Sequence, residues 1–285
     1  MVGLSIWVTF CKNEVNHRRT SSLVGKVKVP CPPRVFPMGE FSPLELSVHS
    51  QPAQESVERV AKKMLVTGFA AQMYATNCWV LATGEGSECV VIDPGMPDVS
   101  LELADLLTKF RLKPVATLLT HGHLDHTFSV VPICDGYGIP AYIHSEDRNL
   151  LLDPAAAVSP EFGATLAGMK FTEPHEVKEL KSGEEFELVG LKIKAIHSPG
   201  HTRGSLMFLV NEETLVSGDV LFAGSIGRTD LPTGSSADMQ KTLIKKVLPL
   251  DDEIRVLPGH NQETKIGIER KSNPYLIEAA KASRS

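Results

Sequence analysis

Three histidines and an aspartate stand within six residues of one another, directly after a short apolar stretch. Residues 115–119 have the length and composition of a buried strand, and they are closely followed by His121, His123, Asp125 and His126. In extended backbone, residues two apart point to the same side, so the first two histidines can hold one metal ion. The aspartate and third histidine lie beyond them and suit a second ion, since hydrolases often pair ions about 3.5 to 4 Å apart. The segment therefore predicts half of a two-metal centre.

Three further ligand candidates each follow another short apolar segment. These candidates are His201, Asp219 and His260. A zinc ion takes about four donors, and a catalytic site leaves one of those positions to water, so the first segment alone is incomplete. Taken singly, His201 or His260 would be an ordinary turn residue, but beside the first segment each becomes a ligand candidate. All of these side chains can meet only if the strand ends that carry them lie along one edge of the sheets.

The spacing of apolar residues predicts two strand-rich halves with helices outside them, which is an αββα sandwich of the α/β class. Residues 101–110 and 237–247 show the helical pattern. Strands are expected at residues 64–68, 78–82, 88–92, 115–119, 141–143, 186–188, 191–196, 206–210, 214–216 and 254–257. We expect residues 64–285 to form one domain, a length that can bury a substantial core.

Residues 1–63 differ in composition from the rest of the chain. They contain nine basic and five acidic residues, a balance of +4, so the remainder carries −9 because the whole chain carries −5. Six prolines and the lack of sustained periodicity argue against a packed unit. We interpret this segment as an extension upstream of the native start or a disordered tail. A targeting peptide is the alternative, because few acidic residues occur before Glu40.

Composition favours a soluble enzyme in a reducing compartment, which predicts a cytoplasmic location. The chain is 42% hydrophobic and 22% charged and has no apolar run long enough to span a membrane, so no membrane association is expected. Its five cysteines are an odd number without close pairing, which argues against a disulfide framework. The acidic domain with no basic stripe argues against nucleic-acid binding.

The motifs resemble those of the metallo-β-lactamase superfamily, and within it those of the compact hydrolases similar to type II glyoxalase. The resemblance covers residues 64–285. The matching segments are residues 92–95, 120–126, 197–205 (HSPGHTRGS), 217–222 (SGDVLF), 227–230 (GRTD) and 258–260. These motifs are specific to the superfamily and much less specific to a substrate.

The resemblance implies a role for each ligand candidate. His121, His123 and His201 would hold a first ion, Asp125, His126 and His260 a second, and Asp219 would bridge the two. Asp125 and Asp219 are thereby expected to be the catalytic carboxylates, and Asp93 is expected to orient a ligand by hydrogen bonding. Arg228 is open to two interpretations, support of the site or an ordinary salt bridge. Zinc is the ion expected, with iron or manganese as alternatives.

The resemblance also implies an activity, the hydrolysis of a hydroxyacyl thioester by water activated on the metals. A thiol with a pKa near 8.5 leaves as the thiolate, so no general acid is required. The main alternative is a persulfide dioxygenase, which uses one iron held by the equivalents of His121, His201 and Asp219. A lactonase or β-lactamase is a further alternative on the same centre.

Full-length type II glyoxalases add a helical domain that binds glutathione after the last metal histidine. His260 is 25 residues from the end of this sequence, so we expect no such platform. A glutathione thioester is therefore not favoured over a thioester of another small thiol. The expected partner is a small-molecule thioester, and the sequence does not address the oligomeric state.

Overall fold

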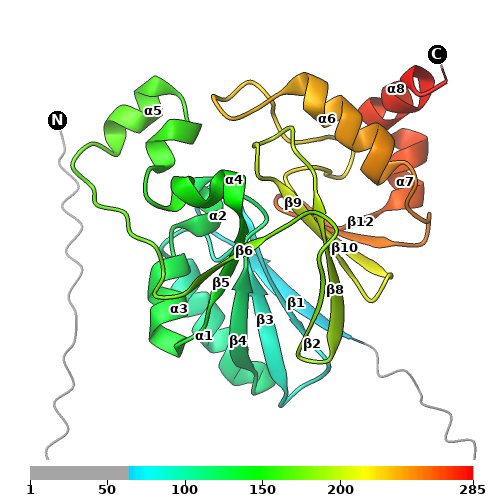
Figure 1. Cartoon of the computed structure of the whole chain (residues 1–285). Helices are drawn as coiled ribbons and strands as arrows, with labels where there is room; N and C mark the ends of the chain where they lie inside the picture. Colours follow the sequence, from blue (N-terminus) through cyan, green and yellow to red (C-terminus); the bar gives the residue numbers. More distant parts are fainter. Residues whose placement is uncertain (1–63, 285) are drawn as a thin grey trace, which may run out of the picture. The chain divides into compact units, whose positions relative to one another are not determined.

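The computed structural model describes residues 64–284 of the chain. The predicted extension at residues 1–63 lies outside the described residues. Two six-stranded sheets form the centre of the described part, with helices on their outer faces (Figure 1).

The first sheet contains the strands of the N-terminal half in sequential order. Strands β1 to β3 pair antiparallel, and β3 to β6 pair parallel. The strands are β1 (Leu65–Ala70), β2 (Asn77–Ala82), β3 (Glu88–Ile92), β4 (Lys113–Leu118), β5 (Ala141–His144) and β6 (Val177–Leu180).

The second sheet contains the strands of the C-terminal half, also in sequential order. Strands β7 to β10 pair antiparallel, β11 joins β10 in parallel, and β12 closes the far edge antiparallel to β11. The strands are β7 (Glu185–Leu188), β8 (Leu191–His197), β9 (Leu206–Val210), β10 (Thr214–Gly218), β11 (Arg255–Pro258) and β12 (Thr264–Lys265).

Helices connect the parallel strands and follow the second sheet. The α-helices are α1 (Val99–Phe110), α2 (Leu124–Thr127), α3 (Val130–Tyr137), α4 (Ser145–Arg148), α5 (Pro160–Thr165), α6 (Ser236–Thr242), α7 (Ile266–Ser272) and α8 (Pro274–Ala282). Two 3-10 helices, η1 (Asn149–Leu151) and η2 (Pro154–Ala157), follow α4, and a π-helical segment, η3 (Leu243–Val247), extends α6.

Four apolar clusters lie within the layers, and three of them define the arrangement. The inner faces of both sheets form the central cluster, in which Phe208 is fully buried. Helices α1 and α3 cover the outer face of the first sheet, and α6, α7 and α8 cover that of the second. Strand β3 is apolar at every position after Glu88 because both of its faces are covered. The predicted αββα sandwich is confirmed.

Each predicted strand is present, and its bounds differ from the prediction by at most two residues. Strands β6 and β12 and the helices outside the two predicted ones were missed. β6 reads Val-Lys-Glu-Leu and lies at a sheet edge, where it is half exposed, so it lacks the apolar pattern of a buried strand. Among the described residues, no helix combines the length and apolar character needed to cross a membrane.

Candidate metal centre

The seven predicted ligands come together beside the ends of four strands. β4 leads into the segment that contains His121 and His123. β8, β10 and β11 end shortly before the three downstream ligands His201, Asp219 and His260. Within the described residues, three groups have donor atoms close enough to share an ion, and six of the seven ligands belong to them.

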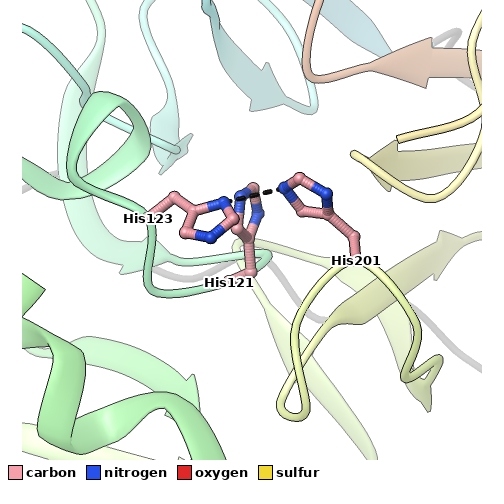
Figure 2. Close-up of side chains that lie close together, drawn as sticks. All are labelled: His121, His123 and His201. Carbon is pink, nitrogen blue, oxygen red and sulfur yellow. Dashed lines mark hydrogen bonds between the residues drawn. The ribbon is translucent and has the colours of Figure 1, made fainter. Parts of the chain in front are cut away.

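The first group consists of His121, His123 and His201, all buried (Figure 2). Nδ1 of His123 lies 2.8 Å from Nε2 of His201, and the centroid of the His121 ring lies 4.7 Å from that of His201. The rings stand nearly perpendicular to one another, and one nitrogen of each ring lies within 4.8 Å of those of the other two. Three imidazoles whose nitrogens converge can bind one ion.

The second group consists of Asp125, His126 and His260. Nε2 of His260 lies 3.3 Å from both Oδ2 of Asp125 and Nε2 of His126. Asp125 and His126 belong to the short helix α2 rather than to an extended segment. The structure therefore differs from the single extended loop expected from the sequence. A helical turn brings the side chains of Asp125 and His126 close to His260.

Asp219 lies between the two groups. Its Oδ1 is 3.4 Å from Nε2 of His126, and its Oδ2 is 3.4 Å from Nε2 of His201 and equally far from Nε2 of His260. One carboxylate thus faces ligands of both groups, which is the position that a bridging ligand requires.

Asp93 and Thr120 fix the outer nitrogens of two ligand rings. Oδ2 of Asp93 accepts hydrogen bonds from Nδ1 of His126 and from the Thr120 hydroxyl, at 2.9 and 2.6 Å. Because that hydroxyl donates to Asp93, it accepts from Nδ1 of His121, 3.0 Å away. Both rings therefore keep an Nε2 lone pair for the centre, a common arrangement around metal-binding histidines. The expected hydrogen bond from Asp93 to a ligand is present, whereas the role of Thr120 was not predicted.

Backbone carbonyls fix two further rings. Nδ1 of His201 donates to the carbonyl of Arg228, and Nδ1 of His260 donates to that of Tyr74, at 2.8 and 3.0 Å. The Arg228 side chain is exposed and forms a salt bridge with Asp230. Only the backbone carbonyl of Arg228 contacts the site, so the structure favours the salt bridge as the role of this side chain. Neither carbonyl could be identified from sequence, because a carbonyl group is common to all residues.

Three buried atoms of the cluster have no hydrogen-bond partner among the described residues. They are Nε2 of His121, Nε2 of His123 and Oδ1 of Asp219. Buried polar atoms are normally paired, because leaving one unpaired costs free energy. Imidazole and carboxylate donors gathered in this way fit divalent cations such as zinc, iron or manganese.

The electrostatics of the site also suit cation binding. Burial and the neighbouring imidazoles hold the pKa of His121 well below its usual value, and burial lowers the pKa of His123 to about 3. Both rings are therefore neutral at pH 7, as metal ligands must be. Burial opposes a charge on His126, but the carboxylates of Asp125 and Asp219 raise its pKa to about 9. The same negative charges attract a cation, and an ion bound at this ring would replace its second proton.

The second group is the more accessible of the two. In the second group His126 is fully buried, but the side chains of Asp125 and His260 are 25% and 20% exposed, whereas all three histidines of the first group are buried. Tyr74, whose carbonyl contacts His260, is exposed and makes an edge-to-face contact with Phe162. A small molecule would therefore reach the centre from the side of the second group.

The sequence around this centre matches a known family. The model of the Metallo-beta-lactamase superfamily matches residues 72–260, which contain all seven ligands. The chain belongs to this superfamily. Members of the superfamily are generally enzymes, and many are metal-dependent hydrolases.

Curated relatives cover most of the metallo-β-lactamase domain. An uncharacterized protein of Mycobacterium tuberculosis is 44% identical over 220 residues, which are 75% of this chain and 98% of the relative. The hydroxyacylglutathione hydrolase GloC of Haemophilus influenzae is 32% identical over 209 residues, which are 71% of this chain and 93% of GloC.

Solved structures agree with the fold. The crystal structure of the B3 metallo-β-lactamase BLEG-1 superposes with a TM-score of 0.66 at 34% identity, covering 74% of this chain and 99% of BLEG-1. The crystal structure of TTHA1623, which is a di-iron-bound form, superposes with a TM-score of 0.61 at 31% identity, covering 73% of this chain and 99% of the other. The chain is thus similar to a protein that holds two metal ions.

Proposed function

We propose that this protein is a metal-dependent hydrolase that cleaves a hydroxyacyl thioester of a small thiol. The observation that carries the proposal is the position of Asp219, whose two oxygens face ligands of two different three-residue groups. The similarity to GloC supports the choice of a hydroxyacyl thioester. The similarity to a di-iron-bound protein supports a pair of ions, of which zinc is our first choice.

The side chains of the site would hold the ions and fix their surroundings. His121, His123 and His201 would hold one ion, Asp125, His126 and His260 the other, and Asp219 both. Bound divalent ions supply Lewis acidity and lower the pKa of water from about 15.7 towards about 7, which provides a nucleophile at neutral pH. Asp125 and Asp219 would be the catalytic carboxylates, because they contribute the negative charges next to the reacting water.

Two neighbours hold the accessible side of the site in place. The Thr76 hydroxyl donates to Oδ2 of Asp125 at 2.9 Å, and the Tyr74 carbonyl orients His260. Both come from the segment between β1 and β2, so this segment sets the ligands that a substrate would meet first. Since a thiol with a pKa near 8.5 leaves as the thiolate, the proposed reaction needs no proton donor at this position.

The thiol carrier is part of the proposal. After His260 the described chain forms α7 and α8, whose apolar side chains pack on the outer face of the second sheet rather than over the metal centre. These helices therefore provide no platform for a tripeptide beside the ligands. We propose a small thiol other than glutathione, held mainly through its acyl group at the ions. The name of GloC, a hydroxyacylglutathione hydrolase 93% of whose length is covered, favours glutathione instead, so S-lactoylglutathione is the substrate to compare.

The test combines metal analysis with four substrates. Protein purified without chelators is analysed for metal, then assayed with S-lactoylglutathione, S-lactoyl-N-acetylcysteamine, a chromogenic β-lactam and glutathione persulfide. We expect two ions per chain and hydrolysis of the thioesters, with the smaller thiol preferred. Asp219→Ala should lose turnover, while the exposed Asp105→Ala serves as the matched control.

Other outcomes would overturn the proposal in distinct ways. A single iron with oxygen consumption on the persulfide would establish the dioxygenase instead. Turnover of the β-lactam without turnover of either thioester would establish a lactamase. A preference for S-lactoylglutathione would overturn only the choice of thiol.

A further inference from the structure

A fully buried carboxylate outside the metal cluster contacts both loops that carry the histidines of the first group. Asp147 lies in α4 and has no exposed surface. Its Oδ2 accepts from the backbone N–H of Gly122 at 2.9 Å and from the Thr202 hydroxyl at 2.6 Å. Its Oδ1 accepts from the backbone N–H of Gly204 at 2.7 Å. One side chain therefore joins two loops that lie about eighty positions apart in the sequence.

These contacts occur next to the ligands themselves. Gly122 stands between His121 and His123, and Thr202 directly follows His201. The bases of the two loops are already linked, because the N–H of Leu206 donates to the carbonyl of Thr120 at 2.7 Å. Asp147 adds the link between the tips of the loops.

Both loops need a glycine where Asp147 approaches. A Cβ on Gly122 would lie 2.8 Å from the carbonyl oxygen of Asp147, and a Cβ on Gly204 would lie 2.6 Å from its Cγ. Real Cβ atoms essentially never come this close to other heavy atoms. The packing around Asp147, with Leu150 beside Gly122, is therefore too tight for a side chain at either glycine.

We propose that Asp147 is a positioning residue of the metal centre. By accepting hydrogen bonds from both loops, it holds His121 and His123 at the distance from His201 at which all three can bind one ion. Hydrogen bonds to a charged acceptor are about twice as strong as neutral ones, and buried polar neighbours of metal ligands commonly set metal affinity. The inference rests on the proposed two-metal function, but it concerns ion binding rather than turnover.

The test measures zinc affinity of the first group in the full chain. An Asp125→Ala background removes one ligand of the second group, so that competition with a chromogenic chelator reports mainly on the first. Adding Asp147→Asn keeps the size of the side chain and removes its charge. We expect zinc affinity to fall by about 10- to 100-fold, as found for partners of metal ligands.

Glu269 provides a matched control. It is also a buried carboxylate, and it accepts from the N–H of Gly224, the Thr264 hydroxyl and Nδ2 of Asn273. It contacts neither of the two histidine loops. In the same background, Glu269→Gln should destabilise the protein to a similar extent in urea unfolding but retain the zinc affinity of the first group.

Equal zinc affinity in the Asp147→Asn and Glu269→Gln proteins would overturn the inference. If Asp147→Asn does not fold, Thr202→Val removes one of the three donors, and a several-fold loss of zinc affinity is then expected. Unchanged affinity in Thr202→Val would in that case overturn the inference. Because no substrate is used, the absence of thioesterase activity would refute the proposed function without affecting this result.

Discussion

Replacing Asp93 by asparagine should weaken both the fold and the metal centre. Three donors converge on the carboxylate of Asp93: the N–H and hydroxyl of Thr120 and Nδ1 of His126, at 2.8, 2.6 and 2.9 Å. Asn is the suitable substitution because residue 93 has a φ of 49°, a left-handed conformation that asparagine tolerates.

The expected size of the effect follows from these three hydrogen bonds. The amide has one acceptor oxygen, which can keep the hydroxyl and the histidine, and its NH₂ group then faces the N–H of Thr120. The Thr120 N–H and the amide NH₂ are then both left without an acceptor, and an unpaired buried donor costs about 1–3 kcal/mol. Zinc affinity should fall by about 10- to 100-fold, because Asp93 orients His126 directly and His121 through Thr120.

Urea unfolding of the metal-free protein measures the first effect, and competition with a chromogenic chelator measures the second. Asp105→Asn, an exposed position in α1, is the control and should change the free energy of unfolding by less than about 0.5 kcal/mol. An Asp93→Asn protein with the parent's unfolding free energy and zinc affinity would refute the reasoning that these donors depend on one charged acceptor.

Three further predictions concern other parts of the described chain. Asp219→Ala should lower kcat/KM for the thioester by at least about 100-fold and reduce the metal content, since both oxygens face ligands; parent-like kinetics would exclude a bridging role. Phe208→Ala, in the fully buried cluster between the sheets, should lower the free energy of unfolding by about 3–5 kcal/mol in urea titration, and a loss under 1 kcal/mol would contradict the packing. Burial raises the pKa of the Cys89 thiol to about 12 and that of Cys134 to about 11, so both should resist iodoacetamide at pH 8 until the protein is unfolded. Peptide mapping by mass spectrometry checks this, and rapid labelling of the native protein would refute it.

The sequence predicted the layers well because the signals for them are local. Short apolar stretches such as residues 88–92 and 206–210 mark strands buried on both faces, and the structure places strands at these same residues. Helix α2 was missed because a four-residue helix is too short to show a period. The edge strand β6 was missed because its apolar and polar residues do not alternate clearly.

The ligand candidates were also accessible from sequence, since each follows the end of an apolar stretch. Of the residues that hold the ligands, Asp93 was predicted through the family resemblance, but the identity of its partner, His126, 33 residues away, was not. Thr202 and Asp147 are 55 residues apart, so no local pattern joins them. The carbonyls of Tyr74 and Arg228 carry no sequence signal at all.

The sequence by itself determined which side chains are candidates to bind metal and which segments form the sheets, because the chemistry and the apolar periodicity of the residues are local properties of the chain. Only the tertiary structure decided that Asp219 lies between two groups of candidate ligands, which outer ring nitrogen of four of the histidines is held, and that Asp147 joins two loops. The physical reason is that these properties depend on distances between atoms far apart in the sequence. Such distances are set when the two sheets pack and their strand ends meet.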